Sequence, residues 1–185
     1  MVAARTAICG DFKPRDSPDY PISYRYYGAF CAADQAAFDK GDLSATPLYY
    51  GIWAFRQIEQ GRFVDLDLPD TELGKLRAYG VEGRHGELTV VLINVQDPAA
   101  ADSTSDVVSL ELPSSYRHGK EVTLGSSAPE GLASSDASAV SLGGWQIRPD
   151  GKATGTPVGR SMKVHGTTFA AEVEPGTAQL ITLTR

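Results

Sequence analysis

The sequence predicts a mainly β protein, an antiparallel β-sandwich of about eight strands preceded by a short segment that contains α-helix. From residue 62 onward, apolar runs recur at a spacing of roughly 8–12 residues with turn residues between them, which is typical of a sandwich. Before residue 62, a stretch with helical periodicity follows a segment rich in aromatic residues. We therefore expect two parts in this chain of 185 residues: residues 1–61, and a β-sandwich domain of residues 62–185.

Residues 1–45 crowd aromatic side chains among prolines and aspartates. So many large rings in a short piece need a surface to cover. We expect the segment to wrap onto the helix that follows it. The aromatic residues are Tyr20, Tyr24, Tyr26, Tyr27, Phe30 and Phe38.

The helix is predicted over residues 46–61. Thr46 is a good N-cap residue, Pro47 suits the first helical position, and Gly61 can adopt the left-handed conformation that ends a helix. One apolar face is predicted to hold Leu48, Ile52, Phe55 and Ile58. Because Tyr49, Tyr50 and Trp53 widen the apolar sector, we expect the helix to be packed on two sides.

Residues 62–185 read as short strands separated by turns. The run of residues 88–95 is almost entirely apolar and is predicted to be a central strand buried on both faces. Turns are predicted at residues 83–86 and 116–119, and residues 125–138 are predicted to be a long surface loop. Strands are predicted over residues 63–68, 76–81, 88–95, 107–112, 121–124, 162–164, 169–173 and 178–183, and two short runs, 139–142 and 145–147, flank Gly143 and Gly144.

The composition excludes several classes of protein. The chain is 42% hydrophobic with a formal net charge of -6, and it has no run of basic residues. Binding to nucleic acid or to an anionic membrane requires clustered Lys and Arg, so neither is predicted as a partner. Neither a signal peptide nor an apolar run long enough to span a membrane is recognisable, which predicts a cytoplasmic protein for the sequence as written. Cys9 and Cys31 could pair, but a single pair is not a disulfide scaffold, so we expect free buried thiols.

Candidate chemistry is sparse. His85, His118 and His165 each precede a glycine in a predicted turn, where no second metal ligand is nearby, so no metal site and no cofactor are predicted. The glutamates of the strand region alternate with apolar residues or adjoin turns, and they are predicted to lie on the solvated face of a sheet. They are Glu82, Glu87, Glu111, Glu121, Glu172 and Glu174.

One alternative concerns carbohydrate. Trp145 is the only tryptophan of the strand region, and it follows Gly143 and Gly144 in a way that could expose it. An exposed aromatic ring on a sheet can stack on a sugar ring. A carbohydrate-binding module, with carbohydrate as its partner and Trp145 in its site, is therefore one alternative function. An interaction domain with no role in sugar binding is another.

The order of several motifs resembles the C-terminal part of glycoside hydrolase family 79, the β-glucuronidase and heparanase family. Members join a (β/α)8 barrel to a β-sandwich. The matching stretches are residues 9–13 (CGDFK), 19–22 (DYPI), 47–55 (PLYYGIWAF), 140–144 (VSLGG) and 175–181 (PGTAQLI). The resemblance implies that residues 1–61 are a remnant of the barrel, with residues 46–61 as its closing helix, and that residues 62–185 are the sandwich.

The resemblance also implies that the catalytic half is absent. Both catalytic glutamates of the family lie on barrel strands that precede this region, and the first glutamate of this chain is Glu59. No catalytic residue is therefore predicted, and no activity in isolation. The expected partner is a barrel, or a missing N-terminal half. Because the family is commonly secreted or lysosomal, the resemblance gives a localisation different from that of the sequence as written.

Gly10, Asp11 and Phe12 occupy the positions of a family loop that helps to hold the sugar carboxylate, and the resemblance makes them candidate substrate-binding residues. Phe12 has no hydroxyl group to donate, and an ionised Asp11 would repel a uronate. The match therefore does not carry over a preference for glucuronides.

Overall fold

The computed structural model describes residues 8–9, 28–31, 35–58, 60–66, 75–133, 137–148 and 150–185. Its α-helices are α1 (Gln35–Lys40) and α2 (Pro47–Arg56), and its 3-10 helices are η3 (Gly131–Ala133) and η4 (Ala137–Ala139). Its strands are β1 (Ile8–Cys9), β2 (Phe30–Cys31), β3 (Ser44–Ala45), β4 (Gly61–Val64), β5 (Leu76–Gly83), β6 (Leu88–Asn94), β7 (Asp106–Ser126), β8 (Val140–Leu142), β9 (Gln146–Ile147), β10 (Ala153–Thr154), β11 (Arg160–Val173) and β12 (Ala178–Thr184).

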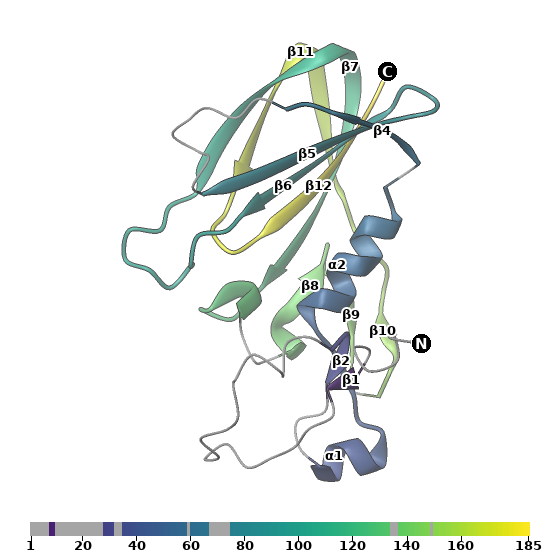
Figure 1. Cartoon of the computed structure of the whole chain (residues 1–185), viewed down its shortest axis with the longest axis vertical. Helices are drawn as coiled ribbons and strands as arrows, with labels where there is room; N and C mark the ends of the chain where they lie inside the picture. Colours follow the sequence, from purple (N-terminus) through teal and green to yellow (C-terminus); the bar gives the residue numbers. More distant parts are fainter. Residues whose placement is uncertain are drawn as a thin grey trace.

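The main sheet has the strand order β11-β7-β12-β6-β5-β4, with β8 paired to β7, and all its pairings are antiparallel. The second half of β7 pairs with β12, whereas its first half pairs only with β11. Between these halves lies Pro113, which has no backbone N–H to give to a ladder. Figure 1 shows β7 and β11 arching over the top of the molecule, so that one continuous sheet folds into two layers.

The hydrophobic core lies between these two layers. Inward side chains of β5, β6 and β12, such as Leu76, Leu92 and Ile181, face Val108 and Phe169 from β7 and β11. Burial alternates along the first half of β7, as expected for a strand with one face in a core. The prediction of a mainly antiparallel β-sandwich is confirmed, and β6 lies in the interior of its sheet as expected.

The predicted turn at residues 116–119 is wrong, because β7 runs through it without interruption. Gly119 is needed here for a close approach, not for a turn. A Cβ atom at this position would lie 2.6 Å from Cγ of Met162 on the neighbouring strand β11. A glycine in a strand can mark such a contact as well as a bend.

Helix α2 begins as predicted and ends earlier. Thr46 precedes it with an extended backbone and Pro47 occupies the first position, but the Thr46 hydroxyl donates to the Gly28 carbonyl oxygen at 2.7 Å and does not cap the helix. The helix ends at Arg56, so the expected role of Gly61 at its C-terminus is wrong. Gly61 starts β4, where a side chain would collide with the Glu82 carbonyl oxygen.

Helix α2 lies beside β8 and β9, below the two layers of the sandwich (Figure 1). Tyr50 of this helix and the buried residues around it form a second hydrophobic cluster, which is separate from the sandwich core. The small three-stranded sheet β1-β2-β3 leads directly into this helix. None of the helices among the described residues is long and apolar enough to cross a lipid bilayer.

Candidate functional site

The candidate site is helix α2, which has one locked face and one open face. On the locked face, Tyr50 is fully buried and Tyr49 and Trp53 are half-buried. These rings surround the indole of Trp145, whose centroid lies 4.9 Å from that of Trp53 and 5.7 Å from that of Tyr50. Such tilted and edge-on pairs are favourable arrangements of aromatic rings.

Tyr50 also fixes the helix through its hydroxyl group, which accepts a hydrogen bond of 2.8 Å from the backbone N–H of Ile147 on β9. Burial raises the pKa of Tyr50, and the hydrogen bond from Ile147 offsets part of this rise. The residue therefore joins α2 to the 140–147 segment by packing and by one polar contact.

Trp145 reaches this cluster because of the glycines before it. Gly143 and Gly144 both have positive φ, and Leu142 and Trp145 exchange two backbone hydrogen bonds of 3.0 Å. Two central residues with positive φ define the tight turn that matches the twist of a hairpin. The turn folds Trp145 back against α2, where its exposed fraction is 8%. The expectation that Trp145 is exposed is therefore wrong, and its role in sugar binding stays a prediction.

The open face of α2 carries the α2 stripe, which we define as Leu48, Ile52 and Phe55. Their exposed fractions are 40%, 50% and 69%. Positions i, i+4 and i+7 lie in one row along a helix, so the three side chains form a continuous strip. At its start, Leu48 borders a hollow of about 240 Å³ lined also by Pro47, Leu132 and Ala133.

The sequence predicted a helix that is packed on two sides. The structure buries the aromatic side and leaves the α2 stripe exposed, so the prediction is wrong for the stripe. The aromatic side is buried because Val140, Leu142 and Trp145 from a distant part of the chain pack there. Periodicity alone shows that a helix has an apolar face, but not which of two apolar faces finds a partner.

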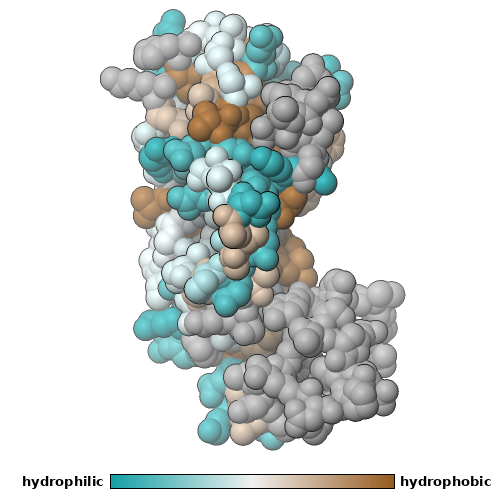
Figure 2. All heavy atoms as spheres, turned by 90° about the vertical axis from the view of Figure 1, so that its left-hand side faces the viewer, coloured by the Kyte–Doolittle hydropathy of each residue, from teal (hydrophilic) through white to brown (hydrophobic). Residues whose placement is uncertain are grey.

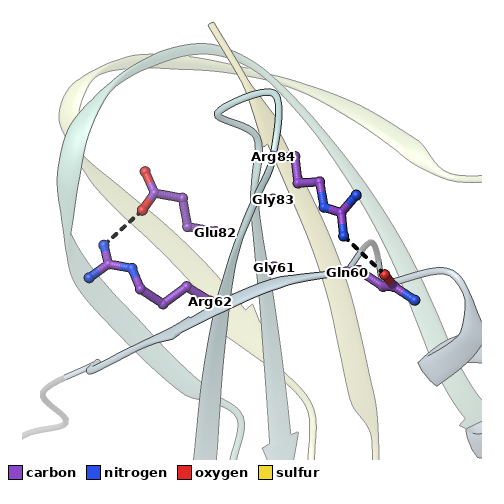
Figure 3. Close-up of a pocket in the computed structure, with 6 residues that line it drawn as sticks. All are labelled: Gln60, Gly61, Arg62, Glu82, Gly83 and Arg84. Atoms are coloured by element: carbon purple, nitrogen blue, oxygen red, sulfur yellow. Dashed lines mark hydrogen bonds and ion pairs between the residues drawn. The ribbon is translucent and has the colours of Figure 1, made fainter.

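A second hollow, of about 510 Å³, lies at the β4–β5 end of the sheet (Figure 3). Its polar side chains are already satisfied by one another. Arg62 pairs with Glu82 at 3.0 Å, and Arg84 donates to Gln60 at 3.3 Å. Figure 3 shows the two guanidinium groups on opposite sides of the strands, so they do not converge on one ligand.

The remaining predicted groups either lie outside the described residues or form no metal site within them. Gly10, Asp11 and Phe12 lie outside the described residues, so their candidate role stays a prediction. Among the residues that the structure describes, no cluster of three or more His, Cys, Asp or Glu side chains could hold a metal ion. Glu121 corrects the expectation of a solvated carboxylate: its side chain is buried and pairs with Arg160 at 2.7 Å.

The cysteine prediction is also corrected. Free buried thiols were expected, but Cys31 is disulfide-bonded. Among the described residues there is no free cysteine.

Neither a protein-family model nor a curated protein matches the chain. Solved glycoside hydrolases do resemble it in fold. A MgGH51 α-L-arabinofuranosidase with bound arabinose matches at a TM-score of 0.56 and 14% identity, over 85% of this chain and 21% of that one. A 4-O-α-L-rhamnosyl-β-D-glucuronidase from Fusarium oxysporum 12S matches at a TM-score of 0.55 and 20% identity, over 86% and 32%.

A GH51 arabinofuranosidase from Xanthomonas axonopodis pv. citri matches at a TM-score of 0.51 and 16% identity, over 85% of this chain and 29% of that one. The chain therefore spans between 21% and 32% of the length of these three solved chains. At such identities the likeness is one of fold. The fold of this chain is thus similar to that of a part of each of these three glycoside hydrolase chains.

Proposed function

We propose that this chain is the non-catalytic β-sandwich portion of a β-glucuronidase-like glycoside hydrolase, and that it supports a (β/α)8 barrel supplied outside these 185 residues. In this proposal residues 1–61 are the barrel-side segment and residues 62–185 the sandwich domain. The motif resemblance to family 79 supports the glucuronidase assignment.

The observation that carries the proposal is the α2 stripe. An amphipathic helix normally turns its apolar face toward a core, with polar residues outward. Here Ile52 and Phe55 are at least half exposed although the opposite face of the same helix is locked against Trp145. A helix that is apolar on both sides is expected where two bodies meet.

The α2 stripe by itself is too small to hold a partner. Covering the exposed area of the stripe would contribute on the order of 1 kcal/mol for each of its three side chains. That is too little for a stable association by itself, since specific interfaces bury about 1,200–2,000 Å² in total. The stripe is therefore expected to be one part of a larger contact.

The side of the molecule shown in Figure 2 does not supply the rest of such a contact by itself. Its described hydrophobic residues form small patches separated by hydrophilic ones. Scattered apolar side chains of this kind are normal on a protein surface and need no partner.

Two experiments test the proposal in the isolated chain. Purified protein is expected to release no product from p-nitrophenyl β-D-glucuronide or p-nitrophenyl α-L-arabinofuranoside. Turnover that follows the protein through successive purification steps and persists would refute the non-catalytic role.

The second experiment probes the stripe with a dye that fluoresces on exposed apolar surface. Ile52→Glu combined with Phe55→Glu is expected to lower dye binding while shifting the free energy of unfolding by only about 0.5 kcal/mol per site, because both residues are exposed. Val107→Glu is the control, since Val107 is 72% exposed on β7. A large loss of stability in the double variant would show that the stripe already packs within this chain.

A carbohydrate-binding module remains the second candidate, and one observation favours it. Phe63 on β4 and Tyr79 on β5 have exposed fractions of 72% and 48%. Phe63 pairs with Val81, so Tyr79 lies diagonal to it on the same face of the sheet, about 7–8 Å away. Calorimetric titration with glucuronic-acid and arabinose oligosaccharides is expected to show no binding. Binding that is lost in Tyr79→Ala and kept in Trp145→Ala would favour the module instead.

A further inference from the structure

The strand topology identifies the cysteine to which Cys31 is bonded. The chain has two cysteines, so an intramolecular bond must join Cys31 to Cys9. β1 pairs with β2 in parallel, and the register places Cys9 directly beside Cys31. We infer that Cys9 and Cys31 form a covalent staple that holds β1 on the small sheet leading into α2, and that the chain matures where thiols are oxidised.

The small sheet needs a staple because its strands are so short. β1, β2 and β3 have two residues each, and a sheet of this size supplies few hydrogen bonds. Strands pairing over so few residues are not stable on their own in water. A parallel pair must also be joined by a long connection, and here residues 10–29 separate β1 from β2.

The two other strands of the small sheet are also held by contacts with α2 and with the residue before it. β3 runs into α2, and Ala45 is fully buried in the aromatic cluster. β2 is held through Phe30, whose ring centroid lies 4.8 Å from that of Tyr49, and through the Ala29 carbonyl oxygen, which accepts from the Thr46 N–H at 3.0 Å. Among the described residues, β1 is an edge strand of the small sheet and is paired with β2. A covalent bond at Cys31 therefore connects the edge strand β1 to a strand that packs against α2.

The bond acts chiefly by restricting the unfolded chain. Closing the loop between residues 9 and 31 removes conformations from the unfolded state and leaves the folded one unchanged. Its formation oxidises the two cysteine thiols. Their two electrons and two protons pass to an oxidant such as a small-molecule disulfide, which is thereby reduced to two thiols. Disulfides of this kind persist in secreted, periplasmic or lumenal proteins and are rare in the cytosol. This inference does not depend on the proposed barrel.

The pairing is tested by peptide mapping of the whole chain without reductant. Trypsin is expected to give one linked species in which residues 6–15 are joined to residues 26–40, and its mass is lower by two hydrogen atoms than the sum of the two peptides. In a second preparation, the source cells are quenched with acid, and the protein is then denatured and alkylated before any exposure to oxidant. Alkylation of both cysteines in that preparation would overturn the inference. So would a linked pair of two 26–40 peptides.

The staple's role is tested by hydrogen exchange at the amides of β2. Reduction with dithiothreitol, or Cys9→Ala combined with Cys31→Ala, is expected to speed exchange at Cys31 and Phe30 at least tenfold and to leave β6 unchanged. Ser44→Ala is the matched control, because Ser44 is the partner of Cys31 on β3 and forms no covalent bond. Unchanged exchange at β2 after reduction would refute the staple, and the peptide map decides the pairing even if the double variant fails to fold.

Discussion

The hydroxyl group of Tyr50 offers the sharpest test of how α2 is held. Tyr50→Phe removes one oxygen atom and keeps the ring, so the packing against Trp145 should survive. The backbone N–H of Ile147 would then lose its acceptor, which now lies 2.8 Å away. Because Tyr50 is fully buried, water cannot replace that acceptor without a rearrangement.

An unsatisfied buried donor costs about 1–3 kcal/mol, and the gain from burying a less polar ring offsets part of this cost. We expect the free energy of unfolding to fall by about 1–2 kcal/mol, a factor of roughly 5–30 in the folding equilibrium. For a chain of this size the melting temperature should fall by about 2–4 °C for each kcal/mol.

The assay is urea unfolding followed by tryptophan fluorescence. The midpoint is expected to shift at an unchanged slope, since the same surface is exposed on unfolding. Tyr79→Phe is the matched control, because Tyr79 is 48% exposed, and its effect should stay within about 0.5 kcal/mol. Equal stability of Tyr50→Phe and Tyr79→Phe would refute the view that Tyr50 locks the helix.

Three further predictions follow from particular contacts. Burial raises the pKa of Tyr50 above its ordinary value of 10.0. The stabilising contribution of Tyr50 is therefore present below pH 10 and is lost as pH rises through the folded-state pKa. The free energy of unfolding, measured against pH, should fall more steeply above about pH 10 in the wild type than in Tyr50→Phe. Gly143→Ala should lower the free energy of unfolding by more than about 2 kcal/mol, because its Cβ would lie 2.5 Å from the Val158 carbonyl oxygen. Gly144→Ala, with a similar φ and open space around it, should lower it by only about 1–2 kcal/mol. Equal losses of stability in thermal unfolding would contradict this. Arg160→Met should lower the free energy of unfolding by about 1.5–3 kcal/mol, because it leaves the buried Glu121 carboxylate without its cation. Adding Glu121→Gln to this variant should recover part of that loss. No recovery in denaturant unfolding would speak against a stabilising Arg160–Glu121 ion pair.

The sandwich could be predicted from the sequence because its strands obey a local rule. Alternation along residues 107–112 and the apolar run of β6 follow directly from one-sided and two-sided burial. The predicted turn at residues 116–119 failed because glycine has two uses. Gly119 admits Met162 from a strand more than forty positions away, and no local pattern signals that contact.

The candidate site was harder to predict because it depends on long-range packing. Both the helix and its two apolar faces could be predicted from the sequence. The aromatic face is the buried one because Trp145, which lies far along the chain, packs against it. The same holds for Cys31, whose bond depends on the parallel register of two very short strands. Glu121 has the alternating neighbours of a solvated residue, and its cationic partner Arg160 lies on another strand, β11.

The central claim, that the α2 stripe receives a barrel, is tested most directly by co-purification. The 185 residues with an affinity tag would be co-expressed with the barrel sequence read from the adjoining DNA, and the retained barrel would be quantified. Our account predicts that the wild-type chain and Val107→Glu retain the barrel, whereas Ile52→Glu combined with Phe55→Glu loses most of it at an unchanged unfolding midpoint. Equal retention by the wild type and the double variant, or adjoining DNA that encodes no barrel, would contradict the account.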